Sequence, residues 1–218
     1  MLQSENENMN IYVGNYHEVL QSYHLLKGVG HVISEERNVE TEIVNFCKKE
    51  NIQISLVQSG DHVNEVAKKL GQIDLCIVAS FGLILKNPFI DRVKRIINIH
   101  PGSLYNSRGR HPLPFAIRLG LSSMTLTAHI IEDEKIDNGP IVMEMNMPID
   151  YSVSYRDNDK RLRSCLPYIT RYILESLDNR FNIPAIHADL THSPYNKPID
   201  KEELSELMNA TTLDRYKK

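Results

Sequence analysis

Short apolar runs alternate with segments of helical periodicity through the first half of the chain. Strands are predicted where apolar residues alternate or run together, at residues 10–13, 31–33, 52–57, 73–80 and 96–99. Helices are predicted between them, where apolar residues recur every three or four positions, at residues 16–27, 39–50 and 61–70. We expect Asp61 to cap the third helix, because its carboxylate can accept from free N–H groups of the first turn. Strands that alternate with helices imply βαβ crossovers, so the pattern predicts an α/β fold with an open, mostly parallel sheet.

The second half of the chain predicts a hairpin and a long helix. Two further strands are expected at residues 124–131 and 140–148, joined by a loop rich in carboxylates, and a helix follows at residues 157–177. Beyond Asn179 the chain is spaced by prolines, with one more helix at residues 201–208. We therefore expect a single main domain with a short tail at each end: a flexible tail over residues 1–8, the domain over residues 9–180 and an irregular C-terminal appendage over residues 181–218. Met1 and Met9 both stand as candidate start residues.

Composition narrows the class of protein without identifying it. Of 218 residues, 41% are hydrophobic and 24% charged, a balance typical of globular proteins and unlike a mainly disordered chain. The net charge is −3 and no apolar run approaches ~20 residues, so we expect neither a nucleic acid nor a membrane partner. The three cysteines lie far apart, which argues against a disulfide framework and a cysteine-based zinc site. The polar N-terminus does not resemble a secretion signal, and we expect a cytoplasmic protein.

Two strand ends carry the candidate chemistry, because ligands of open α/β sheets bind beyond the carboxyl ends of strands. Asn98 and His100 lie at the end of the strand expected at 96–99. Their spacing of two puts both side chains on one face in an extended segment. An amide and an imidazole together can stabilise an oxyanion and move a proton. The second place is the loop 132–139, from which a carboxylate could orient His100. Taken singly, each feature has an ordinary structural explanation, such as a turn at Asp137 or a solvated loop at Arg108.

Three blocks in order together resemble the folate-dependent formyltransferase superfamily. They are Asn98 to Ile117 (NIHPGSLYNSRGRHPLPFAI), Thr127-Ala-His129 followed by Ile136-Asp-Asn-Gly-Pro-Ile141, and Ser80-Phe-Gly-Leu-Ile-Leu85. The resemblance extends from about Ile73 to Val142. Two positions depart from the family pattern: Gly102-Ser-Leu-Tyr105 stands for the usual Ser-Leu-Leu-Pro, and Thr125 stands for a common glycine.

This resemblance implies a Rossmann-like fold and a set of site residues. The expected formyl donor is 10-formyltetrahydrofolate, with no metal. The family's catalytic Asn–His–Asp set corresponds to Asn98, His100 and Asp137, with His129 supporting Asp137. Asn98 and protonated His100 would hydrogen-bond the oxyanion, while Asp137 would assist the imidazole and relay a proton. The pterin pocket is expected at Phe81, Gly82, Leu83, Ile84, Leu85, Ile131, Glu132, Asp133, Glu134 and Lys135.

The three blocks do not identify the amine that receives the formyl group. We therefore infer the amine by excluding known acceptors of the family. The loop after the first strand, Gly14-Asn-Tyr-His-Glu18, is a poor phosphate cradle, which disfavours glycinamide ribonucleotide. The short C-terminus and negative charge disfavour methionyl-tRNA. An amino-dideoxy sugar nucleotide of surface-polysaccharide (lipopolysaccharide O-antigen) synthesis is favoured, with acceptor contacts at Tyr16, Arg108, Arg110 and His111. Peptide or siderophore amines, a non-catalytic folate-binding protein and a homodimer remain open.

Overall fold

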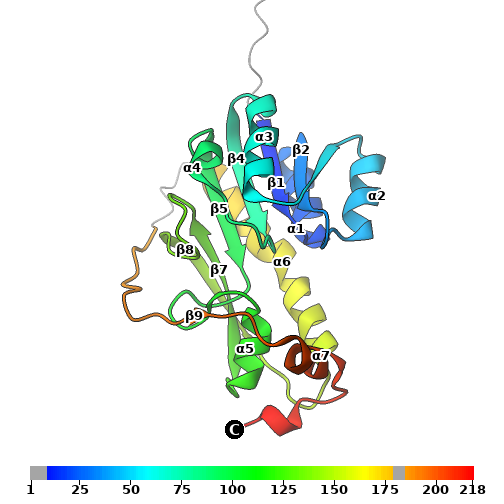
Figure 1. The fold of residues 1–218 in the computed structure, drawn as a ribbon, viewed down its shortest axis with the longest axis vertical. Helices are drawn as coiled ribbons and strands as arrows, with labels where there is room; N and C mark the ends of the chain where they lie inside the picture. Colours follow the sequence, from blue (N-terminus) through cyan, green and yellow to red (C-terminus); the bar gives the residue numbers. More distant parts are fainter. Residues whose placement is uncertain (1–8, 179–184) are drawn as a thin grey trace, which may run out of the picture.

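The protein is built on one seven-stranded sheet in a computed structural model that describes residues 9–178 and 185–218 (Figure 1). The strand order is β3-β2-β1-β4-β5-β7-β8. The first five strands are parallel: β1 (Met9–Gly14), β2 (His31–Glu35), β3 (Gln53–Val57), β4 (Ile73–Ala79) and β5 (Val93–His100). The last two, β7 (Ser123–Ile130) and β8 (Ile141–Pro148), form an antiparallel hairpin beside β5. The strand order reverses direction between β1 and β4, which is where sheets of this kind open a crevice for ligands.

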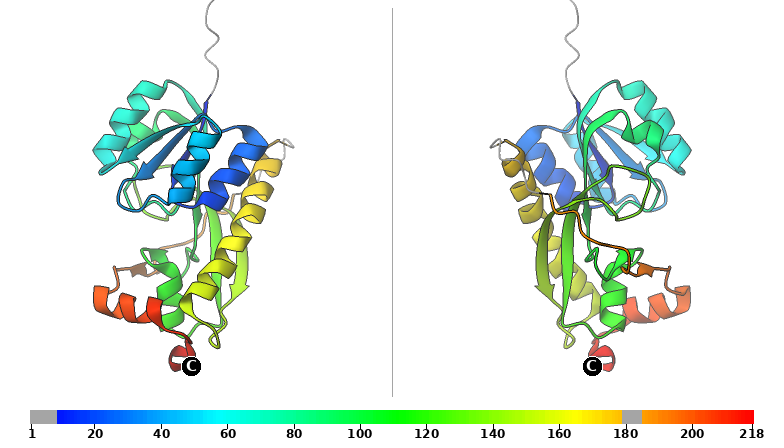
Figure 2. Two further views of the ribbon diagram at one scale, coloured as in Figure 1. Left: turned by 90° about the vertical axis from the view of Figure 1, so that its right-hand side faces the viewer. Right: turned by 90° about the vertical axis from the view of Figure 1, so that its left-hand side faces the viewer.

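Helices cover both faces of the sheet, as the two views of Figure 2 show. One face packs against α1 (His17–Lys27), α2 (Thr41–Lys49), α5 (Pro112–Arg118), α6 (Tyr155–Asp178) and α7 (Lys201–Asn209). The other packs against α3 (Gly60–Leu70) and the short α4 (Asn87–Ile90). Alternate strand residues serve the two faces: Tyr12 belongs to the first hydrophobic cluster, and its neighbours Ile11 and Val13 to the second. Strands buried on both sides explain the near-continuous apolar runs of the sequence.

The structure confirms the α/β fold class, and the expected strands and long helices occur within a few residues of their predicted bounds. The prediction that Asp61 caps α3 is wrong. Ser59 is the cap and accepts from the His62 amide at 3.2 Å, whereas Asp61 lies inside the first turn and pairs with Lys86 at 2.8 Å. The elements that the pattern missed are short: α4, α5, β6 (Arg108–Gly109), β9 (Tyr195–Asn196) and a 3₁₀ turn at Asp214–Tyr216. The expected N-terminal tail and the expected domain boundary at residue 180 lie outside the described residues.

Residues 185–199, which we call the C-terminal strap, connect the hairpin to the far end of the molecule. Ile186 and Ile141 exchange two backbone hydrogen bonds of 2.8 and 2.9 Å, and β9 pairs in parallel with β6. In Figure 1 the orange segment that contains β9 runs from the β7–β8 hairpin towards α5 and α7. Beyond the strap, Leu207 and Leu213 are buried in the same hydrophobic cluster as the sheet. The C-terminal residues therefore share the main core.

Candidate active site

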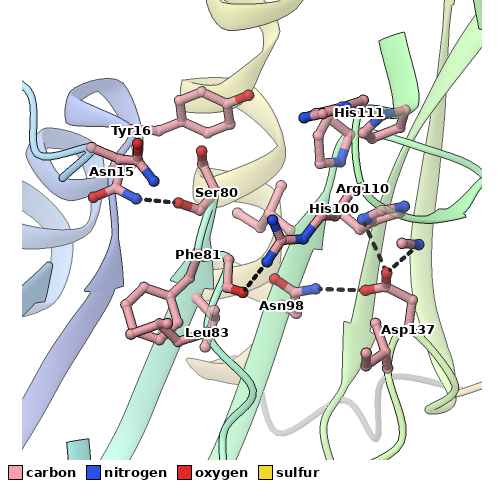
Figure 3. Close-up of a pocket in the computed structure, with 18 of the residues that line it drawn as sticks. Asn15, Tyr16, Ser80, Phe81, Leu83, Asn98, His100, Arg110, His111 and Asp137 are labelled. Atoms are coloured by element: carbon pink, nitrogen blue, oxygen red, sulfur yellow. Dashed lines mark hydrogen bonds and ion pairs between the residues drawn. The ribbon is translucent and has the colours of Figure 1, made fainter. Parts of the chain in front are cut away.

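A cavity of about 680 Å³ opens at the carboxyl ends of β1, β4 and β5, where the strand order reverses (Figure 3). Its walls come from widely separated parts of the chain: the loops after β1, β4 and β5, residues 109–114, the loop between β7 and β8, α6, α7 and Tyr195. Two parts of the wall differ in chemistry. The apolar half is lined by Phe81, Leu83, Ile84, Leu85 and Ile131. The acidic half is lined by Tyr16, Glu40, Tyr155 and Asp159.

Asn98 and His100 reach the cavity because of their place in β5. The residues of this strand alternate between the two sheet faces, so Ile96, Asn98 and His100 point to the face that α3 and α4 cover. Ile96 belongs to the core of that face, and polar side chains replace apolar ones where the strand enters the cavity. His129 is the cross-strand neighbour of Asn98, and its Nε2 lies 3.0 Å from Asn98 Nδ2. The predicted sharing of one face by Asn98 and His100 is therefore present.

Asp137 is the point where these side chains meet. Its Oδ1 accepts from Asn98 Nδ2 at 3.2 Å and lies 3.4 Å from His129 Nε2. Its Oδ2 accepts from the Gly109 amide at 2.8 Å and lies 3.6 Å from His100 Nδ1. Burial alone would raise the pKa of Asp137, but the charge of His100 and hydrogen bonds from His129 and the Gly109 amide outweigh burial and lower it to about 2. Asp137 is thus a fixed negative charge beside two imidazoles.

His100 is enclosed by oxygen atoms on both sides of its ring. Nε2 lies 2.8 Å from the carbonyl oxygen of Ser107, a partner that can only accept, so Nε2 carries a hydrogen. Nδ1 faces the Asp137 carboxylate. The ring is thus held between two oxygen acceptors, one from the backbone and one from a carboxylate. Amide and imidazole N–H donors beside a buried carboxylate are what a reaction through a tetrahedral oxyanion needs.

Backbone strain is concentrated around this cavity. Among the described residues, four that are not glycine have positive φ, and Ser80 (53°), His111 (56°) and Asp137 (46°) line the cavity. Left-handed backbone is costly for such residues, and it persists where the surrounding structure enforces it, which is common at functional sites. Gly139 allows the Asp137 loop to close, because a Cβ there would lie 1.6 Å from the Ile130 carbonyl oxygen.

The two loops expected to hold the pterin line the cavity, with one exception. Phe81 to Leu85, Ile131 and residues 133–135 are part of the wall, whereas Glu132 is exposed and is not. Several polar side chains of these loops already have protein partners: Glu134 accepts from the Asn87 amide at 2.8 Å, and Lys135 pairs with Asp133 at 2.9 Å. Glu35, from the end of β2, accepts from the Gly82 amide. Their assignment to the pterin stays a prediction.

Three of the four residues expected to contact the acceptor line the cavity: Tyr16, Arg110 and His111. Arg108 does not. Its Nη1 donates to Asn138 Oδ1 at 3.0 Å and its Nη2 to the Ser193 carbonyl at 3.3 Å, so it ties the Asp137 loop to the strap. The strap also reaches His100 indirectly, because Asn196 Nδ2 donates to Ser107 Oγ at 3.0 Å.

Sequence reasoning missed several residues of the wall: Asn15, Glu35, Glu40, Tyr155 and Asp159. Asn15 had a usable signal, since it directly follows β1 at the point where the strand order reverses. Tyr155 and Asp159 are one helical turn apart on α6, a spacing that also fits an ordinary solvated helix face. Among the described residues no group of three or more His, Cys, Asp and Glu is placed to hold a metal ion. Within the same ranges, no helix has both the length and the apolar character needed to cross a bilayer.

Comparison with known proteins assigns the class. The family model described as formyl transferase matches residues 29–167, and the chain belongs to this family. The match covers β2 to the middle of α6, and so includes Asn98, His100, His129 and Asp137.

Relatives within the family differ in what they act on. The chain is 28% identical to methionyl-tRNA formyltransferase of Ehrlichia canis over 71% of this chain and 51% of that protein. It is 28% identical to the mitochondrial formyltetrahydrofolate deformylase 1 of Arabidopsis thaliana over 58% of this chain and 39% of that protein. The chain thus spans about half or less of the length of the curated relatives it matches.

Solved structures share the fold at low sequence identity. An N-formyltransferase from Helicobacter canadensis, in complex with folinic acid and dTDP-3-aminofucose, superposes with a TM-score of 0.68 at 20% identity, over 87% of this chain and 70% of that one. Phosphoribosylglycinamide formyltransferase of Streptococcus pneumoniae superposes with a TM-score of 0.68 at 18% identity, over 78% of this chain and 98% of that one. The two neighbours act in different chemical contexts, so the fold alone does not select an acceptor.

Proposed function

We propose that this protein transfers a formyl group from 10-formyltetrahydrofolate to the primary amine of an amino sugar carried by a nucleotide. The observation that carries the proposal is the meeting of Asn98, His100 and Asp137 in one cavity, with Asp137 bonded to Asn98 and facing His100. A protein that only binds folate has no need of an amide, an imidazole and a carboxylate at the same point. Membership of the formyl transferase family supports the same reaction class.

The reaction assigns one task to each side chain. The acceptor nitrogen attacks the formyl carbon, a C–N bond forms, and the carbonyl oxygen becomes an oxyanion. To stabilise it, an N–H group of Asn98 and one of His100 turn from the acceptors that they have in this structure. Collapse of this intermediate breaks the bond between the formyl carbon and N10 of the folate. His100 gives its proton to N10 and takes the proton that the amine loses. With a pKa of about 2, Asp137 is a weak proton acceptor, so we assign it to holding His100 in position and balancing its charge.

The apolar half of the cavity suits the donor. Phe81, Leu83 and Ile131 offer surface for a flat pterin ring, and they pack against the hydrophobic cluster under α3 and α4. The polar edge of a pterin needs donors and acceptors, which exposed backbone groups of the two loops can supply. The acidic half is a separate part of the same cavity wall and leaves room for a second substrate. That second space favours an amine acceptor over water, the acceptor that a deformylase would use.

The acceptor class is tested by offering several amines with 10-formyltetrahydrofolate. The candidates are a dTDP-linked 4-amino-4,6-dideoxy sugar, the corresponding 3-amino sugar, glycinamide ribonucleotide and methionyl-tRNA. Mass spectrometry detects the N-formyl product, and absorbance reports release of tetrahydrofolate. We expect formylation of an amino sugar nucleotide. Formyl-glycinamide ribonucleotide or formyl-methionyl-tRNA as the preferred product would overturn the acceptor, and formate release without any amine would indicate a deformylase.

A further inference from the structure

The acidic half of the cavity lies at the N-terminal end of α1, where Tyr16, the residue before the helix, lines the wall. Free N–H groups and the helix dipole make such a helix end attractive to phosphate. In this protein a carboxylate already stands there: the His17 amide donates to Glu40 Oε2 at 3.3 Å. Glu40 comes from the residue just before α2, and Tyr16, the residue at the start of α1, supplies no side-chain cap of its own.

The cation nearest to this helix end is fully engaged as well. Arg163 of α6 donates to both oxygens of Glu40 at 2.6 and 2.8 Å and to both oxygens of Glu18 at 2.8 and 2.9 Å. Its guanidinium also lies over the Tyr16 ring, 5.0 Å from the centroid. Two carboxylates share one guanidinium, so this group of three carries a net negative charge. A phosphate placed here would find the His17 amide already bonded to Glu40 and the Arg163 guanidinium already paired with two carboxylates.

Asp159 adds a further negative charge, and it points to a different kind of ligand. It lies one helical turn before Arg163 and lines the cavity near Tyr16 and Tyr155. Within the described part of the chain its carboxylate accepts no hydrogen bond. Burial, followed by the charges of Glu18 and Glu40, raises the pKa of Asp159 against the opposing effect of Arg163. A carboxylate so placed gains most from a ligand that brings hydrogen-bond donors.

We propose that the acidic half binds the part of the acceptor that presents hydroxyl or ammonium hydrogens to Asp159, and that it excludes phosphate groups. The inference rests on the proposed function and sharpens it. The sugar ring lies in the cavity beside Tyr16, Tyr155 and Asp159, and the diphosphate of the nucleotide leaves the cavity away from the start of α1. Asp159 is then a residue that selects the acceptor, while Glu40 and Arg163 close the anion site.

The first experiment measures acceptor binding and turnover in Asp159→Asn and Asp159→Ala. We expect Kd and KM for the dTDP-linked amino sugar to rise about tenfold or more in Asp159→Ala, and less in Asp159→Asn, whose amide oxygen still accepts. Binding of 5-formyltetrahydrofolate should stay unchanged in both. Glu175→Gln is the matched control, because Glu175 is an exposed carboxylate on α6 that pairs with Arg171 outside the cavity. Unchanged acceptor affinity in Asp159→Ala, or no binding of the amino sugar by the unmodified protein, would overturn the proposal.

The second experiment measures inorganic phosphate binding by calorimetry and thermal shift, with sodium chloride at equal ionic strength as reference. We expect no saturable binding to the unmodified protein. Phosphate binding that competes with the amino sugar and that Asp159→Ala strengthens would overturn the proposal, because it would place an anion in the acidic half. The Kd of the first experiment and the phosphate binding of the second are measured without formyl transfer, so these outcomes are separate from that of the proposed function. If the amino sugar binds through Asp159 but is not formylated, the binding assignment stands and the transfer reaction fails.

Discussion

The two halves of the cavity are built in different ways. The apolar half is formed by two continuous loops, residues 80–85 after β4 and residues 131–136 after β7, and Glu35 already occupies one of its backbone amides, that of Gly82. The acidic half gathers single side chains from the residue before α1, from the residue before α2 and from α6. A loop that follows a strand is placed by the strand itself, whereas distant side chains meet only after the helices have packed. The apolar half is therefore encoded locally, and the acidic half is encoded by tertiary contacts.

The largest expected effect comes from Asp137, which bonds to Asn98 and faces His100. Asp137→Asn keeps the shape of the side chain and removes the charge beside His100. We expect turnover to fall by about 100- to 10,000-fold, the range of general acid–base catalysis, because the imidazole loses its fixed partner. Donor and acceptor affinities should change little. Single-turnover formyl transfer and separate binding titrations measure the two quantities, and an unchanged rate would reduce Asp137 to a turn residue.

Removing either donor of the oxyanion should cost slightly less. We expect Asn98→Ala and His100→Ala each to lower turnover by roughly 100-fold or more. Both side chains contact polar groups at a strand end and make no part of the apolar core, so folding should survive, as circular dichroism can verify. Near-normal transfer by either variant contradicts the assignment.

Gly82→Val tests whether the apolar half alone holds the folate. Even a Cβ at Gly82 would come within 3.3 Å of Glu35 Oε1, and the larger branched side chain would push into the wall of the apolar half. We expect affinity for 5-formyltetrahydrofolate to fall by about 5- to 150-fold, equivalent to about 1–3 kcal/mol of overpacking. Acceptor affinity should remain. Glu134→Gln is the control on the same half, with little change expected, and equal donor binding by Gly82→Val and the unmodified protein would refute the placement.

Arg108→Ala tests whether the strap positions the catalytic loop. Loss of the hydrogen bonds to Asn138 and Ser193 should loosen the Asp137 loop and lower kcat about tenfold, with both KM values unchanged, since Arg108 lies outside the cavity wall. Arg108→Lys keeps the charge but not the forked geometry, so we expect only partial recovery. A rise in acceptor KM without a change in kcat would instead support direct contact with the acceptor.

The last expected effect is on acid stability and not on catalysis or binding. The pKa of Asp137 is lowered from 3.8 to about 2 in the folded protein. A lowered carboxyl pKa contributes stability above the unfolded value, and that contribution is lost as the pH falls from about 4 to about 2. It amounts to about 2 kcal/mol at neutral pH. Urea unfolding from pH 7 to pH 2 should show a smaller loss for Asp137→Asn than for the unmodified protein, and equal losses would contradict the role of this charge.

Most strands and long helices of this protein could be predicted from its sequence, but the short elements could not. Apolar runs and helical spacing predict β1 to β5 and the β7–β8 hairpin, because each strand and helix buries a face that its own residues form. The same pattern does not predict α5, whose two prolines, Pro112 and Pro114, are typical of loops although the first helical turn tolerates them.

The site residues also fall into those that a local pattern predicts and those that it does not. The spacing of Asn98 and His100 within one strand is enough to predict their common face. Arg108 lies in the loop after β5, and we expected it to contact the acceptor. The structure instead shows it donating to Asn138 and to the Ser193 carbonyl. The sequence around Asp159 and Glu40 does not predict that they line one cavity, because their proximity depends on how α6 and α2 pack around α1.

The strap also determines when the catalytic site can form during synthesis. His100 and Asp137 are held by Ser107 and Gly109, and this stretch pairs with Tyr195 and Asn196, some ninety residues later in the chain. A ribosome releases the sheet and the catalytic side chains first and the strap afterwards. The nascent chain therefore carries an assembled sheet with an unbraced catalytic loop until the strap emerges.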